Sequence, residues 1–272
     1  MRKRINIAYW GFSHVSQKTL EILIESKGYY PKLLIVKQKD VLKANEFAEK
    51  YKNKFKVIAS TAPNLKELFS ENKINLSLVV SFGEILNEET INIPKHGTIN
   101  IHYSLLPKYR GASPIESAII NGERETGVSI QKMELKLDSG PILISKSKKI
   151  KANESTGSIE NKLIPIGVDL FLKTTKDITR NKIKEQIQNE KYISISKKIE
   201  PKDMVLDLND KNIYKKYLAL KRRNKLSFRY GDLLVKITKA RFTDNKFVIE
   251  KVIVPGKRET LFADFKRNYK IC

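Results

Sequence analysis

Three polar side chains of this chain have the types and the spacing that acyl-group transfer requires. Asn100 and His102 lie two residues apart, and Asp138 follows later in the turn sequence LDSG. Because side chains alternate between the two faces of an extended segment, Asn100 and His102 point the same way. An amide donor, a titratable imidazole and a carboxylate that orients it can stabilise an oxyanion and move a proton without a covalent nucleophile.

The segment around His102 also predicts where these groups lie in a fold. Pro107 marks a turn just beyond the histidine, so the strand ends there, and open α/β sheets usually keep their active sites at the carboxyl ends of strands. Each residue alone has a simpler interpretation: His102 as a hydrogen-bonded core histidine, and Asp138 as a turn aspartate that accepts local N–H bonds. Only the joint pattern favours catalysis.

Alternating strand and helix patterns fill the first 180 residues and predict a parallel, doubly wound, Rossmann-like sheet. The strands are expected over 5–10, 32–36, 55–58, 76–81, 98–102, 128–133 and 142–150. Helices are expected over 16–27, 41–52, 64–71 with Asn64 as cap, 114–121, and about 156–178, where Pro165 is able to bend the helix.

The pattern changes after residue 180. Residues 181–202 are polar and irregular and are interpreted as a linker. Residues 203–272 are expected to form a small β-rich domain with a helix over 211–222 and strands over 226–230, 233–242 and 246–254.

Length and composition exclude several classes of protein. The chain has 272 residues, 40% of them hydrophobic, which predicts a globular protein with one substantial core and a small additional domain. It contains no long apolar run and no signal-peptide pattern, so we expect a cytoplasmic protein that does not contact a membrane. Cys272 is the only cysteine and the three histidines are scattered, so neither an internal disulfide nor a metal site is expected.

The formal charge of +23 is unevenly distributed. Residues 201–272 hold 19 Lys and Arg against 8 Asp and Glu, whereas the first 200 residues hold 34 against 22. A basic tail indicates a polyanionic partner, although a compositional bias toward lysine explains it equally well. In the tail Lys221, Arg222, Arg223, Lys225 and Arg229 alternate with Tyr217, Phe228 and Tyr230, a pattern suited to phosphates and bases or to an ordinary solvated surface.

The central run GTINIHYSLLPKYRGASPIESAIINGERETGVSIQKMELKLDSGPIL resembles the signature of the folate-dependent formyltransferases, and among them most closely the enzymes that act on methionyl-tRNA. Weaker similarity extends through IAYWGFSHVSQKTLEIL, VVSFGEIL, KKIEPKDMVLDLN and VIVPGKRETLFADFKRNY, so the resemblance covers nearly the whole chain. It implies a catalytic domain over 1–180, a linker over 181–202 and a reduced OB-like domain over 203–272.

The resemblance implies transfer of a formyl group from 10-formyltetrahydrofolate, a co-substrate, to a primary amine without a metal. Asn100 and a protonated His102 would donate to the oxyanion of the tetrahedral intermediate, while Asp138 orients the imidazole and helps to relay protons. The folate site would consist of Ser104, Leu105, Leu106 and Pro107 together with Phe82, Gly83 and Ile85, which follow a strand. Tyr109-Arg110-Gly111 would order the loop over the acceptor, or Arg110 would simply be an exposed cation.

The residues leave two acceptors open. The resemblance favours the amino group of initiator methionyl-tRNA in translation initiation, with the basic C-terminal domain holding the tRNA. The stretch VKQKDVLKA, however, lacks the longer Gly- and Arg-rich loop usual in tRNA-acting members. N-formyltransferases that act on amino-sugar nucleotides do without that loop and are the alternative. A third interpretation is an RNA-binding protein on a catalytically inactive scaffold.

Overall fold

The computed structural model describes residues 5–27, 29–244 and 246–269, so Cys272, on which the prediction about disulfides rests, lies outside the described residues. The chain separates into two compact units. The first contains the residues up to 114 together with 126–148 and 160–196, and the second contains 115–125, 149–159 and the residues from 197 onward. Each unit is described by itself below.

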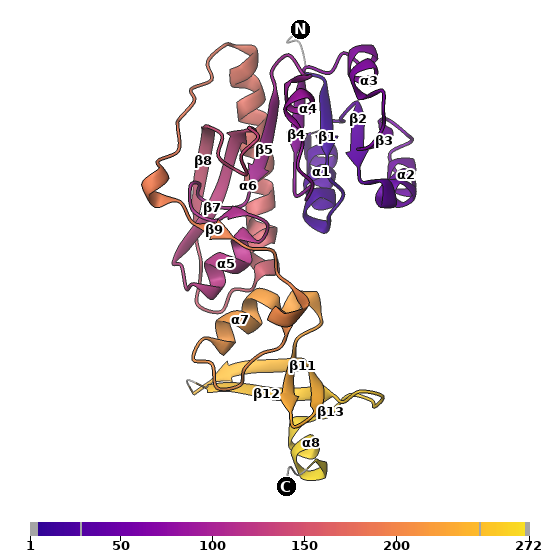
Figure 1. Ribbon diagram of the computed structural model, residues 1–272. Helices are drawn as coiled ribbons and strands as arrows, with labels where there is room; N and C mark the ends of the chain where they lie inside the picture. Colours follow the sequence, from indigo (N-terminus) through magenta and orange to yellow (C-terminus); the bar gives the residue numbers. More distant parts are fainter. Residues whose placement is uncertain (1–4, 28, 245, 270–272) are drawn as a thin grey trace. The chain divides into compact units, whose positions relative to one another are not determined.

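The first unit is built on a seven-stranded sheet with the order β3-β2-β1-β4-β5-β7-β8 (Figure 1). Strands β3, β2, β1, β4 and β5 run parallel, whereas β7 is antiparallel to β5. This mixed, mostly parallel sheet confirms the predicted α/β fold. The strands are β1 (Ile7–Trp10), β2 (Leu33–Val36), β3 (Lys56–Ala59), β4 (Leu76–Val79), β5 (Thr98–His102), β7 (Glu125–Lys132) and β8 (Ile142–Lys149).

Helices follow most of these strands, as a doubly wound topology requires. They are α1 (His14–Lys27), α2 (Val41–Glu49), α3 (Leu65–Glu71), α4 (Glu88–Asn92) and most of α6 (Thr156–Thr179), whereas α5 (Pro114–Ile120) belongs to the second unit except for Pro114. Pro114 opens α5, where its missing N–H costs nothing, and α6 continues helically through Pro165. Asn87 caps α4 by accepting a hydrogen bond from Thr90 N at 2.8 Å.

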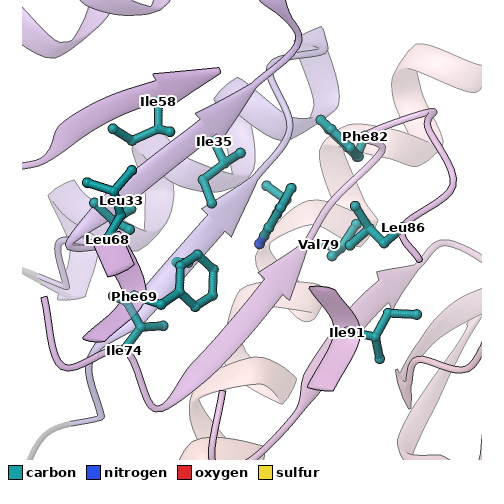
Figure 2. Packing of buried hydrophobic residues seen from close by; sticks show 12 residues of the cluster. Leu33, Ile35, Ile58, Leu68, Phe69, Ile74, Val79, Phe82, Leu86 and Ile91 are labelled. Carbon is teal, nitrogen blue, oxygen red and sulfur yellow. The ribbon is translucent and has the colours of Figure 1, made fainter. Parts of the chain in front are cut away.

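The central strands are buried on both faces because helices cover both sides of the sheet. One face holds Trp10 together with residues of β2, β3 and β4 and the apolar side chains of α3 and α4 (Figure 2). The indole of Trp10 packs edge-on against Phe82, and its N–H donates to Ser77 Oγ at 3.1 Å. On the other face Tyr9 donates from its hydroxyl to Ser16 O in α1 at 2.7 Å. A buried polar group is thus paired on each face of β1.

Gly11 stands where strand order reverses, between the carboxyl ends of β1 and β4. Its φ of +126° lies outside the range of L side chains, and a Cβ placed there would lie 2.2 Å from Val80 O and 2.8 Å from Ser16 Oγ. The backbone therefore turns from β1 into α1 in direct contact with the segment that leaves β4. Sheets of this class bind ligands in the crevice outside these strand ends.

The second unit contains the predicted β-rich region. Strands β10 (Ser227–Tyr230), β11 (Leu233–Thr243), β12 (Lys246–Ile253) and β13 (Thr260–Leu261) form an antiparallel sheet in sequential order, with β10 and β13 at its edges. Helix α7 (Ile213–Leu220) precedes the sheet and α8 (Phe262–Asn268) follows it. The fully buried rings of Phe228 and Phe265 pack edge-on at 6.2 Å and join β10 to α8.

Several predicted boundaries are corrected by the structure. Helix α1 begins at His14 rather than at residue 16. Helix α2 ends at Glu49, and a turn over Lys50 to Asn53 replaces its expected last residues. Helix α7 ends at Leu220, where a 3-10 turn begins. Asn64 precedes α3, but its side chain makes no capping hydrogen bond. Besides the 3-10 turns, five short elements were not predicted: α4, β6 (Arg110–Gly111), β9 (Ile195–Ser196), β13 and α8. Elements of two to seven residues carry too little periodicity to be read from sequence.

No helix in the described part of the chain combines the length and the apolar character that a membrane span needs.

We predict that Gly11→Ala lowers the free energy of unfolding by about 2 to 4 kcal/mol, because the new methyl group meets backbone and the residue adopts an unfavourable φ. Gly97→Ala is the matched control: Gly97 also has a positive φ of +69°, but nothing lies within 4 Å of its Cβ position, so about 1 kcal/mol is expected. Chemical denaturation measures both. Equal losses in the two variants would contradict the steric argument.

Candidate active site

Strands β5 and β7 bring Asn100 and His102 to one edge of the sheet together with a residue that sequence reasoning missed. In their antiparallel register Asn100 is opposite Gln131, and His102 is opposite Ser129. Asn100, His102 and Gln131 are all buried. Gln131 carried no sequence signal beyond its position in a strand, because the pairing of β5 with β7 is a tertiary fact.

The carboxylate of Asp138 is the common acceptor of this cluster. Its Oδ1 accepts hydrogen bonds from Asn100 Nδ2 at 3.2 Å and from Gln131 Nε2 at 2.6 Å. Its Oδ2 accepts from the backbone N–H of Gly111 at 2.8 Å and lies 3.6 Å from His102 Nδ1. The structure thus brings together the three side chains that the sequence singled out.

The orientation of the His102 ring follows from its second contact. Nε2 lies 2.8 Å from the carbonyl oxygen of Tyr109, and because a carbonyl only accepts, Nε2 carries a hydrogen. Nδ1 therefore faces the Asp138 carboxylate, so a proton added at Nδ1 lies between imidazole and carboxylate. The imidazole is held at both nitrogens, which is the arrangement that an orienting carboxylate requires.

Residues 109–111 hold both the histidine and the aspartate. The carbonyl of Tyr109 binds His102, the N–H of Gly111 binds Asp138, and the backbone of Arg110 pairs with β9. Arg110 is only 3% exposed, which excludes the interpretation of this residue as a surface cation. Its guanidinium donates from Nε and Nη2 to Gln188 Oε1 at 3.0 and 2.8 Å.

The turn that carries Asp138 has a backbone that few residues tolerate. Asp138 adopts a φ of +48°, and Gly140 lies so close to β7 that a Cβ would stand 1.8 Å from Lys132 O. Aspartate and asparagine accept the left-handed conformation better than most residues, and only glycine fits the second position. The LDSG sequence therefore serves both the turn and the site.

The predicted folate residues after β5 form an ordered loop. Ser104 is fully buried and donates to Lys108 O at 2.6 Å, while Ser129 Oγ donates to Ser104 O at 2.8 Å and accepts from Leu106 N at 3.1 Å. Leu105 and Pro107 are partly exposed. The loop is thus fixed to β7 next to His102. Its role in folate binding stays a prediction.

The predicted folate residues after β4 are divided between core and surface. Phe82 packs its ring in the core, whereas Gly83 is exposed with a φ of +72° and Ile85 is 85% exposed. The loop is tied to neighbouring strand ends, because Lys37 Nζ donates to Gly83 O at 3.0 Å and Ser60 Oγ donates to Glu84 Oε2 at 3.0 Å. Backbone and an uncovered aliphatic side chain are therefore presented at the carboxyl edge of the sheet.

Other titratable side chains lie apart from this cluster. His14 is exposed at the start of α1, and His96 precedes β5 at its opposite end, where burial and then Lys95 lower the pKa of His96. Burial raises the pKa of Tyr9 and of Tyr103, so both phenols stay neutral in the core. Over residues 5–27, 29–244 and 246–269, no group of three or more His, Cys, Asp or Glu is arranged to hold a metal ion.

The chain matches the model of a known protein family over more than half of its length. The family model described as formyl transferase matches residues 17–175, which include all three residues of the cluster. The methionyl-tRNA formyltransferase of Buchnera aphidicola subsp. Schizaphis graminum is 44% identical over 144 residues, 53% of this chain and 46% of that protein. The matched region spans about half the length of such curated relatives. The methionyl-tRNA formyltransferase of Prochlorococcus marinus is 28% identical over 276 residues, 93% of this chain and 84% of that protein.

Solved structures share the fold. Methionyl-tRNA formyltransferase from Clostridium thermocellum superposes with a TM-score of 0.66 at 14% identity, over 92% of this chain and 99% of that one. The N-formyltransferase from Helicobacter canadensis, in complex with folinic acid and dTDP-3-aminofucose, superposes with a TM-score of 0.66 at 22% identity, over 89% of each chain. A formyltransferase named for methionyl-tRNA and one solved with an amino-sugar nucleotide therefore match this fold with the same TM-score.

We predict that the ring nitrogen Nε2 of His102 carries a hydrogen, because it donates to the Tyr109 carbonyl. Long-range ¹H–¹⁵N spectra report the protonation of each ring nitrogen, and with three histidines in the chain, His102→Gln assigns the signal. An unprotonated Nε2 with the hydrogen on Nδ1 would contradict the described site.

Proposed function

Since this chain belongs to the formyl transferase family, we propose that it transfers a formyl group from 10-formyltetrahydrofolate to a primary amine, and that the amine is the amino group of methionyl-tRNA. The observation that carries the proposal is the convergence of Asn100 and His102 on the Asp138 carboxylate at the carboxyl edge of β5. The proposal includes a cytoplasmic location and a role in translation initiation.

The proposed reaction uses each of these groups at one atom. The uncharged amine attacks the formyl carbon, a carbon–nitrogen bond forms, and the formyl oxygen becomes an oxyanion. A primary amide has two N–H groups, so Asn100 can donate one to Asp138 and the other to that oxyanion. His102 would exchange the Tyr109 carbonyl for the oxyanion at Nε2, while Asp138 keeps Nδ1 in place. The amine proton then passes to the departing folate nitrogen as its bond to the formyl carbon breaks.

The edge of the sheet offers features that suit the folate. A flat conjugated ring needs close approach of backbone and apolar contact on its faces. Gly83 provides exposed backbone without a side chain, and Ile85 and Leu105 provide apolar surface at the ends of β4 and β5. These features support assignment of the donor site to Phe82, Gly83, Ile85 and residues 104–107. Phe82 is buried, so it would support this site from within the core.

The second unit supports an RNA acceptor. Lys221, Arg222, Arg223, Lys225 and Arg229 are all exposed, which provides cations for phosphates. Tyr217, Tyr214 and Phe242 form a ladder of near-parallel rings, with centroid distances of 6.5 and 4.7 Å and interplanar angles of 17° and 16°. Phe242 at its end is 43% exposed. Phe228, which the sequence also offered for stacking, is fully buried and is not available.

An amino-sugar nucleotide is the second candidate acceptor, and one observation favours it. Strand β2 ends at Val36, a 3-10 turn (Gln38–Asp40) follows, and α2 begins at Val41. The chain therefore has no room here for the long loop usual in tRNA-acting members. The matching sugar N-formyltransferase folds are consistent with this alternative. We favour tRNA because the names of the curated relatives share that acceptor. In addition, the exposed cations and the exposed ring of Phe242 suit phosphates and bases better than a small sugar.

Formylation assays decide between the two acceptors. Protein, 10-formyltetrahydrofolate and methionyl-tRNA should yield formyl-methionine after deacylation of the tRNA, at a rate that falls as salt rises. A dTDP-linked amino sugar, tested in parallel, should stay unmodified. Formylation of the sugar alone would overturn the choice of acceptor, and formylation of neither would overturn the proposed activity.

The same assay tests the catalytic assignment. His102→Ala and Asp138→Ala should each lower kcat by at least about two powers of ten, since each removes an oxyanion donor or its orienting group. Ser139→Ala is the control, because Ser139 lies in the same turn but donates to Lys136 O. Near-normal rates in either of the first two variants would refute the roles assigned.

We further predict that Phe242→Ala weakens binding of RNA by about 1 to 3 kcal/mol, the value of one stacked base. Leu234→Ala removes another exposed apolar side chain, 44% accessible, from the same strand and should leave the affinity unchanged. Fluorescence anisotropy with a labelled tRNA measures both. Equal affinities for the two variants would show that the ring ladder does not stack on RNA.

A further inference from the structure

The segment that follows α6 contributes a buried side chain to the turn that carries Asp138. Gln188 is 6% exposed, whereas its neighbours Ile187 and Asn189 are exposed. It belongs to a stretch that is polar and irregular in sequence and that carries no catalytic motif. A buried amide needs hydrogen-bond partners, so the contacts of Gln188 show what it holds in place.

The amide nitrogen of Gln188 holds both ends of the Asp138 turn. Nε2 donates to Asp138 O at 2.9 Å and to Gly140 O at 2.7 Å. These two carbonyls belong to the residue with the left-handed φ and to the glycine that packs against β7. One amide nitrogen thus holds both carbonyls of the backbone from which the carboxylate projects, and it also lies 3.4 Å from Gln131 Oε1.

The amide oxygen of Gln188 determines which way the side chain faces. Oε1 accepts two hydrogen bonds from the Arg110 guanidinium, at 3.0 and 2.8 Å. Because a guanidinium only donates, the oxygen must face Arg110 and the nitrogen must face the turn. Arg110 is itself held by backbone, since its N–H donates to Ser194 O at 2.9 Å and β6 pairs with β9.

We propose that Gln188 is a positioning residue for formyl transfer, and that it acts through Asp138 on His102 while Arg110 fixes its orientation. This proposal rests on the proposed function. The physical reason is geometric: the Asp138 carboxylate meets His102 Nδ1 at 3.6 Å only while the turn keeps its backbone conformation. Displacement of a catalytic group by about 1 Å typically costs about two powers of ten in rate.

The first test replaces the amide with a side chain of similar length that cannot hydrogen-bond. Gln188→Met should lower kcat by about ten- to one-hundred-fold with little change in KM for the formyl donor, because the substrate contacts remain. Gln186→Met is the matched control: it makes the same substitution two residues earlier, at an exposed position in the same segment. Equal kcat values for the two variants would overturn the proposal.

A double-mutant cycle shows whether Gln188 acts through the carboxylate. In an Asp138→Ala background, Gln188→Met should cause no further loss of kcat, because the group that it positions is already absent. Losses that multiply would show that Gln188 acts independently of Asp138, and the proposal would fail.

Ring-nitrogen spectra of the substrate-free protein separate this proposal from the proposed function. The Nδ1 signal of His102 should shift in Gln188→Met and stay unchanged in Gln186→Met, whether or not the protein formylates any amine. If wild-type protein transfers no formyl group, the proposed function fails while these spectra still test the contact.

If Gln188→Met does not fold, Arg110→Lys replaces it, since a lysine cannot donate two parallel hydrogen bonds to one oxygen from a planar fork. Unshifted signals in the variant would overturn the proposal.

Discussion

The site depends on the carboxylate of Asp138, whose hydrogen-bond partners come from other segments of the chain and not from its own turn. Asp138 accepts hydrogen bonds from two amide side chains on neighbouring strands and from the backbone of Gly111, and it faces His102. A charge that is withdrawn from water is tolerated only when such partners replace its hydration. Its side chain is 10% exposed, so these contacts are what allow it to remain at the edge of the sheet.

Strand pairing explains why the hydrogen-bond partners of Asp138 lie next to one another. The parallel strands β1, β4 and β5 end at one edge, and the antiparallel β7 returns along β5 so that Gln131 meets Asn100. Residues 109–111 then close over the same edge and are anchored by β9. One sheet edge thus supplies the hydrogen-bond donors, the imidazole and the frame that holds the turn.

In the proposed function the second unit binds the tRNA, whereas the first unit binds the formyl donor and carries the reacting groups. A small-molecule donor is suited to exposed backbone and apolar side chains at the strand ends, whereas a polyanion is suited to exposed cations and stacked rings. The ladder of Tyr217, Tyr214 and Phe242 arises because α7 lies along the antiparallel hairpin of β11 and β12. Such a ladder cannot be recognised in the sequence, since its members come from a helix and a strand that are separated along the chain.

The sequence by itself determined the α/β class and the long strands and helices, because their periodicity is a local property of the chain. It also offered Asn100, His102 and Asp138 as catalytic candidates, because their types, their spacing and a family resemblance coincide. Only the tertiary structure decided that Gln131, Arg110 and Gln188 share the site, that Phe82 is a core residue while Ile85 is uncovered, and that Arg110 is buried. These facts depend on strand register and on contacts between distant segments. Hydrogen bonds across 50 or more residues, such as Gln188 to Asp138, leave no local pattern from which to infer them.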